Sequence, residues 1–186
     1  MFKRLFGLTP TTNQTVIDAL YDRIVAAARQ PVPYADWDVP DTPIGRFEML
    51  SLHVFLILHR LRGEEQAGRD IAQELTDEFF KDVEHSLREL GISDQGVPKR
   101  MKKLARMFYG RVAAYSGAIE ANDAAALAEA LRRNVRPGEE SWPQAGSLAR
   151  YALLAEAELR SQPTARLLTG EVVFPSPAAS VSGQAA

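Results

Sequence analysis

The 186-residue sequence contains no cysteine, and this absence removes several kinds of site at once. The chain can form no disulfide, no thiolate nucleophile and no sulfur-based metal site. Histidine is also scarce, with three residues in the whole chain. This composition suits a reducing compartment and leaves few options for catalysis or metal binding.

A long apolar run and a strong net charge are missing as well. The most apolar segment, residues 47–62, is interrupted by His53, His59 and Arg60, whereas a membrane-spanning helix needs roughly 20 apolar residues in a row. Residues 1–10 lack the continuous apolar region of a secretory signal, which predicts a cytoplasmic protein. The net charge of −2 gives no general attraction to DNA, so nucleic acid would have to bind a local patch.

The sequence also lacks the common catalytic motifs. It has no glycine-rich phosphate loop, no Gly-x-Ser-x-Gly elbow and no His-Glu-x-x-His motif. Asp82 and His85 share a helix face, and His53 or His59 could approach them, which keeps a metal-dependent helical enzyme as an alternative. We predict a non-enzymatic protein with no catalytic residue, no cofactor and no metal.

What the chain does contain is a series of helical patterns. Apolar residues recur every three or four positions in six segments, as in helices that bury one face. These segments are residues 12–29, 43–62, 64–90, 98–119, 123–134 and 141–162. The sequence therefore predicts an all-α, single-domain bundle of about six helices over residues 11–163.

The segments outside these helices are rich in proline or poor in large apolar residues. Residues 31–43 contain four prolines and are expected to form an extended strap, with Tyr34 and Trp37 buried against neighbouring helices. A peptide-binding role is the alternative for Trp37. Residues 1–10 are expected to form an N-terminal arm, and residues 164–186 an extended arm with a disordered tail.

Charge is segregated between the helices expected at residues 64–90 and 98–119. The first is acidic around a narrow apolar stripe, and the second begins with unopposed basic residues, Arg111 being the last of them. We interpret the basic run as a solvated face or a partner for the acidic helix, with a binding surface as the alternative. Gly91 and Pro98 predict the end of one helix and the start of the next, and hence an antiparallel hairpin.

The segments FEMLSLHVFLILHRLR and ELTDEFFKDVEHSLRELGISDQGVPKRMKKLARMFYGRVAAY resemble the ubiquinol–cytochrome c chaperone family. The likeness covers about residues 18–161 and includes the order of apolar, acidic and basic helices and the Gly-x-Ser-Asp turn. It implies an all-helical assembly chaperone that holds nascent or unassembled cytochrome b of the respiratory cytochrome bc complex (complex III).

The same resemblance implies a place in the cell. Mitochondrial members carry an N-terminal import region and work with a small partner at the ribosome. No such extension is seen here, so we expect a bacterial member that is cytoplasmic and peripheral at the inner membrane. A ribosome or an anionic membrane surface is a further expected partner, and DNA is not.

The resemblance assigns no individual contact residues, so we predict them from charge and expected exposure. The candidates for client or partner binding are Asp77, Glu78, Phe80, Asp82, Lys99, Lys102, Lys103, Arg106, Phe108 and Tyr109. We expect an apolar client segment in a groove, its basic flank on the acidic residues, and anionic lipid or ribosomal RNA on the basic ones. A general RNA- or ribosome-binding module is the other alternative function.

Overall fold

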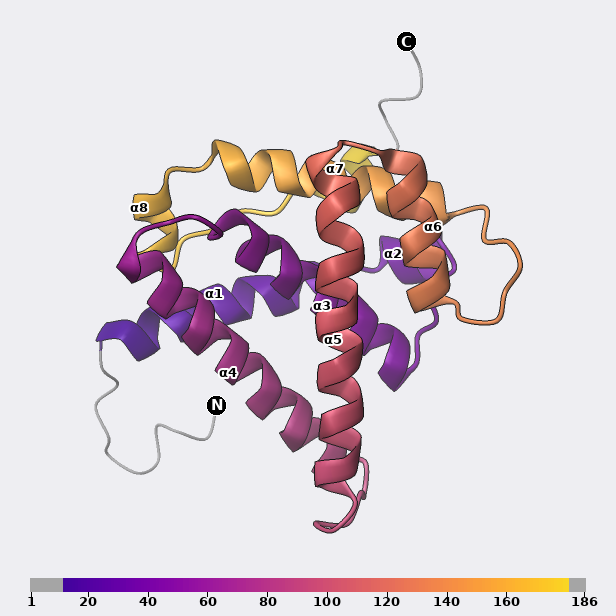
Figure 1. Cartoon of the computed structure of the whole chain (residues 1–186), viewed down its shortest axis with the longest axis horizontal. Coiled ribbons are helices and arrows are strands. Elements are labelled where there is room, and N and C mark those ends of the chain that lie inside the picture. Colours follow the sequence, from indigo (N-terminus) through magenta and orange to yellow (C-terminus); the bar gives the residue numbers. More distant parts are fainter. Residues whose placement is uncertain (1–11, 181–186) are drawn as a thin grey trace.

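The computed structural model describes residues 12–180, and Figure 1 shows them as a bundle of helices. The longer helices are α1 (Thr12–Ala28), α3 (Pro43–Arg60), α4 (Gln66–Glu89), α5 (Val97–Glu120), α6 (Ala124–Val135) and α7 (Ala145–Ser161). Short helical turns are α2 (Val32–Ala35), α8 (Thr164–Leu167) and the 3-10 turn η2 (Pro177–Ser180). The predicted all-α bundle is confirmed. The expected N-terminal arm, residues 1–10, lies outside the described residues.

Helix α3 is the centre of the bundle. Between Phe47 and Ile57 every residue except Leu50 is buried, and the helix contacts α1, α4, α5, α6 and α7. Its start is set locally, because the side-chain oxygen of Thr42 accepts a hydrogen bond from the Gly45 amide at 3.1 Å. The other long helices therefore take their positions from a common apolar axis.

Helices α4 and α5 form the predicted antiparallel hairpin. Gly91 adopts a φ of +78° just after α4, and Pro98 lies in the first turn of α5. In Figure 1 the two helices converge at this turn and diverge toward their opposite ends. Each helix rests a narrow apolar stripe on the core, with Phe79 of α4 and Phe108 of α5 fully buried.

The proline-rich strap differs from the expected extended segment. Residues 32–35 form the single helical turn α2, because Pro31 and Pro33 lie at its start, where a missing N–H costs nothing. Trp37 is 3% exposed and its carbonyl accepts a hydrogen bond from the Trp142 indole at 2.9 Å. The predicted burial of Trp37 is confirmed. The alternative, a peptide-binding role, requires an accessible indole ring, and this ring is buried.

The part of the C-terminal segment that packs on the bundle extends beyond the expected arm. The side-chain amide of Gln162 bonds both backbone groups of Val173, at 2.9 Å to the N–H and 2.8 Å to the carbonyl. The Phe174 ring meets the His53 ring edge-on at 5.2 Å, and η2 contacts α7 and α2. Docking thus reaches residue 180, where the sequence led us to expect a mobile tail, and residues 181–186 lie outside the described range.

Candidate functional site

The three predicted aromatic site residues lie in one cluster on the hairpin. Ring centroids are 5.7 Å apart for Phe80 and Phe108, 6.2 Å for Phe80 and Tyr109, and 5.4 Å for Phe108 and Tyr109. Phe108 is 0% exposed, whereas Tyr109 is 57% exposed. Phe108 is therefore a packing residue in this conformation, and Tyr109 offers the accessible end of the cluster.

Tyr109 borders an open groove where α4 and α5 diverge. The groove has a volume of about 740 Å³ and takes its floor from the second half of α3, including Phe55 and Leu58. Ala72 of α4 and Val112 of α5 line its sides with small or aliphatic groups. We call this opening the hairpin groove. It offers a mainly apolar surface with an aromatic edge.

The predicted acidic residues do not gather around the hairpin groove. Asp77 accepts a hydrogen bond from Gln73 at 3.1 Å, and Glu78 pairs with Lys81 at 3.3 Å on the same helix. Asp82 instead accepts a hydrogen bond at 2.9 Å from Tyr21 of α1. Burial, reinforced by Asp82, raises the pKa of the Tyr21 phenol far above its usual range. Asp82 thus joins two helices, and its carboxylate is not free for a client.

The predicted basic residues share one exposed face of α5. The spacing of Lys99, Lys102, Lys103 and Arg106 is i, i+3, i+4 and i+7, which places them together on a helix surface. Within residues 12–180 none of them forms an ion pair, and no ion pair joins α4 to α5. The interpretation of these cations as partners of the acidic helix is wrong, since the hairpin is held by apolar and aromatic contacts. They remain a hydrated face open to an anionic partner.

Arg111 is a structural residue that the sequence reading placed with the basic face. Its guanidinium donates two hydrogen bonds to the carboxylate of Glu48 on α3, and the two residues are 7% and 3% exposed. Burial raises the pKa of Glu48 although Arg111 opposes that shift. The signal was present: Arg111 continues the buried stripe of Leu104 and Phe108 at a position where a charge is unusual.

The histidines are not arranged as the alternative metal site requires. His53 is fully buried and donates through Nδ1 to the Met49 carbonyl at 2.8 Å, while its Nε2 accepts from the Tyr151 hydroxyl at 2.8 Å. Burial lowers the pKa of His53 to about 4. His85 lies 3.1 Å from Glu89. Across residues 12–180 no group of three or more acidic or histidine side chains is placed to hold a metal ion.

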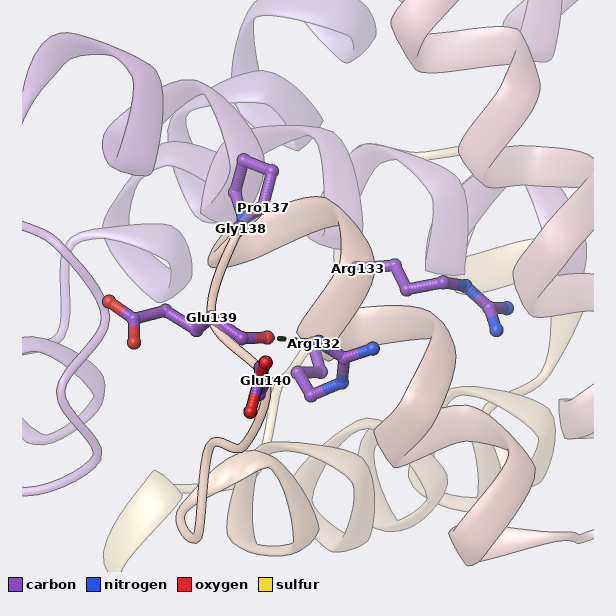
Figure 2. Close-up of a pocket in the computed structure, with 6 residues that line it drawn as sticks. All are labelled: Arg132, Arg133, Pro137, Gly138, Glu139 and Glu140. Atoms are coloured by element: carbon purple, nitrogen blue, oxygen red, sulfur yellow. Dashed lines mark hydrogen bonds between the residues drawn. The ribbon is translucent and has the colours of Figure 1, made fainter.

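A second hollow lies at the end of α6, where the loop 137–140 folds back (Figure 2). Arg132 donates to the Glu139 carbonyl and pairs with Glu129 at 2.9 Å. Arg133, which extends away from the loop in Figure 2, also pairs with Glu129, at 3.3 Å. These interactions pair both arginines with groups of α6 and the loop, so among the described residues the hollow offers no unpaired cation to a ligand.

No helix in the described part of the chain combines the length and apolar character needed to cross a bilayer. Among the exposed hydrophobic residues, Tyr109 lies at the hairpin groove, whereas Ile44 and Leu90 line a different opening. The hairpin groove and the basic face of α5 are thus the surface features that the predicted site residues build.

Three comparisons agree with this architecture. Residues 35–174 match the family model described as ubiquinol–cytochrome C chaperone. The chain is 30% identical over 97 residues to the ubiquinol–cytochrome-c reductase complex assembly factor 1 of Xenopus laevis, a match that covers 52% of this chain and 48% of the frog protein. The match therefore spans about half the length of this curated relative.

The solved structure of the Cbp3 homolog from Brucella abortus is 57% identical and superposes with a TM-score of 0.84, covering 90% of this chain and 92% of that one. The shared helical architecture thus accompanies a high sequence identity over nearly the whole chain. The matched residues 35–174 include α3 through α8, and with them the hairpin and the groove. This chain belongs to the ubiquinol–cytochrome c chaperone family.

Proposed function

We propose that this protein is an assembly chaperone for cytochrome b of the respiratory ubiquinol–cytochrome c reductase complex. In this proposal it holds its client by binding alone and carries out no reaction on it. Family membership supports the chaperone role, and the name of the Xenopus laevis relative supports the complex that is assembled. The choice of cytochrome b as client rests on the family resemblance of the sequence.

The hairpin groove is the observation that carries this proposal. An unassembled membrane protein exposes apolar helices, and covering apolar surface from water is favourable by roughly 25 cal/mol per Å². Tyr109 presents a large ring with a polar tip at the edge of the groove, the kind of side chain that often anchors interfaces. We propose that an apolar client segment lies along this groove, with Phe80 supporting the Tyr109 ring.

The charged residues give the complex an orientation. Cytoplasmic loops of membrane proteins are rich in lysine and arginine, so Asp77, which lies one helical turn beyond the groove residue Gln73, is suited to a basic flank of the client. The basic face of α5 would be repelled by such flanks and suits the negative headgroups of a cytoplasmic leaflet. We therefore propose that the protein works on the cytoplasmic side of the inner membrane, at its surface.

Photo-crosslinking in cells tests the client. A photoreactive amino acid at position 109 should capture cytochrome b, because this exposed side chain borders the groove. The matched control carries the same group at position 150, an exposed residue of α7 outside the groove, and should not capture it. Equal capture from both positions, or no capture from position 109, would contradict the proposal, as would normal amounts of the reductase complex in a strain that lacks the protein.

An RNA- or ribosome-binding module is the second candidate, and the unpaired basic face of α5 favours it. Ribosomal RNA and anionic lipid would both interact with this face through charge, and salt would weaken both contacts. Charge reversal at Lys102 and Lys103 separates the candidates. If the variant co-sediments with ribosomes as the original protein does but floats less with anionic vesicles, the RNA-binding hypothesis is rejected.

A further inference from the structure

A second apolar opening lies near the turn of the hairpin and shares no lining residue with the hairpin groove. It has a volume of about 610 Å³ and is walled by the ends of α1 and α4 and the beginnings of α3 and α5. Phe47, Leu50 and Val83 contribute to an interior that is mainly aliphatic and aromatic. Ile44 and Leu90, which also line it, are 50% and 57% exposed. We call this opening the turn crevice.

Two of the cationic groups that line the turn crevice form no ion pair within the described part of the chain. Three arginines line it, and Arg46 pairs with Asp41 at 2.6 Å. Arg29 and Arg100 form no ion pair or side-chain hydrogen bond with any residue between 12 and 180.

Two carboxylates also line the turn crevice, and each contacts a residue other than an arginine. Asp82 accepts the hydrogen bond of the Tyr21 hydroxyl at 2.9 Å, and Glu89 lies 3.1 Å from the His85 ring. Neither carboxylate forms an ion pair with an arginine of the crevice. An apolar crevice beside two guanidinium groups that form no ion pair among the described residues fits a ligand with one anionic end and one apolar body.

The edge of the turn crevice favours a ligand with an anionic end over a purely apolar protein segment, which would leave Arg29 and Arg100 without a partner. The crevice has a volume of about 610 Å³. A volume of this size lies within the usual range for small ligands, about 300–1,000 Å³.

We propose that the turn crevice is a binding site for a long-chain fatty acid. The hydrocarbon chain lies among Phe47, Leu50 and Val83, and the carboxylate pairs with Arg29 or Arg100 at the exposed edge. Guanidinium and carboxylate groups form charge-assisted hydrogen bonds, which fixes the orientation of the ligand. This activity is separate from client binding, because the hairpin groove and the turn crevice have different walls.

Calorimetric titration of the delipidated full chain tests the ligand class. Oleate should bind saturably with one molecule per chain, at least about tenfold more tightly than oleyl alcohol, because only oleate can form the charge-assisted bond. Equal affinity for oleate and oleyl alcohol would show that the arginines do not select the ligand. Absence of saturable oleate binding below its micellar concentration would overturn the site altogether.

Substitutions locate the site. Arg29→Gln combined with Arg100→Gln should weaken oleate by at least about tenfold and change oleyl alcohol by less than about twofold. The control, Lys102→Gln with Lys103→Gln, removes the same charge from the basic face of α5 and should leave oleate binding unchanged. Equal weakening in both double variants would mean that oleate responds only to net charge, which contradicts the proposal.

A rim substitution gives an independent check. Ile44→Asp places a carboxylate at a half-exposed position of the crevice, so it should weaken both oleate and oleyl alcohol while the circular dichroism spectrum stays helical. Full binding of both ligands by this variant would place the ligand elsewhere. An apolar helical peptide that displaces oleate completely would assign the crevice to a protein partner instead.

Discussion

Replacement of Arg111 by methionine should destabilise the protein strongly, although arginine at this position looks like one more surface cation in the sequence. Methionine keeps an unbranched apolar stem of similar reach and removes the guanidinium. Glu48, which is 3% exposed, then loses the partner that donates both hydrogen bonds to its carboxylate. The variant therefore tests whether the α3–α5 contact depends on a compensated buried charge.

The expected loss is about 3–5 kcal/mol in the free energy of unfolding at neutral pH, because the remaining carboxylate is buried without compensation. At roughly 2–4 °C per kcal/mol for a chain of this size, the melting temperature should fall by about 6–20 °C. A domain is typically stable by about 5–15 kcal/mol, so the variant should still fold at low temperature. Urea denaturation followed by circular dichroism measures the change directly.

The pH dependence of this loss has a definite sign. Burial already raises the pKa of Glu48, and removal of Arg111 removes the interaction that opposes this shift. In the variant the folded state therefore holds a proton on Glu48 that the unfolded state releases above its ordinary pKa. Stability then falls as pH rises through that window, so the difference from the original protein should be smallest in acid and largest near neutral pH.

Two further variants decide whether this reasoning is correct. Glu48→Gln combined with Arg111→Met removes both charges and should recover most of the loss, since no ion is left buried. Arg88→Met, which breaks an exposed pair with Glu84, should leave the urea midpoint unchanged. A double variant as unstable as Arg111→Met alone, or a single variant that melts like the original protein, would refute the account.

Two other predictions concern single positions in α3 and α5. His53 has a folded pKa of about 4 against 6.5 in the unfolded chain, so between these values the unfolded state binds the extra proton and stability should fall on acidification, by up to roughly 3 kcal/mol. Denaturant titrations at several pH values should show that the free energy of unfolding of His53→Gln depends less on pH than that of the original protein. The same pH dependence in both proteins would contradict this assignment. Gly45→Ala places its Cβ 1.8 Å from the Pro40 carbonyl oxygen and should destabilise by at least about 1–3 kcal/mol. The Cβ that Gly117→Ala adds meets no atom within 4 Å, so this variant should stabilise α5 by about 0.5–1 kcal/mol. Equal shifts in the melting temperature of the two glycine variants would contradict both predictions.

Local signals predicted much of the fold. Gly91 and Pro98 mark the two ends of the hairpin turn because their backbone preferences act within a few residues. The apolar run around Met49 predicted a central helix, since only a buried helix can be apolar around most of its surface. The sequence interpretation missed the helical turn α2, because prolines at the start of a turn are compatible with a helix as well as with an extended strap. It also missed the docking of residues 175–180, which depends on contacts with α7 and α2.

The candidate site was predicted only in part. Charge and spacing identified the exposed face that carries Lys102 and Arg106, because helical periodicity alone places these residues together. Exposure was harder to predict for Phe108 and Tyr109, which are adjacent in sequence, yet one is 0% and the other 57% exposed. The phase of α5 against its neighbours decides which of the two faces solvent.

By itself the sequence determined the helical class, the order of the charged helices and the family resemblance, since these depend on residue types and on spacings within a few turns. Only the tertiary structure decided that Arg111 is neutralised inside the core, that Asp82 is bonded to α1, and that two separate apolar openings exist. The physical reason is that packing between segments far apart in the chain sets the partner of each side chain. Local periodicity shows which face of a helix is apolar, but it does not show which segment packs against that face.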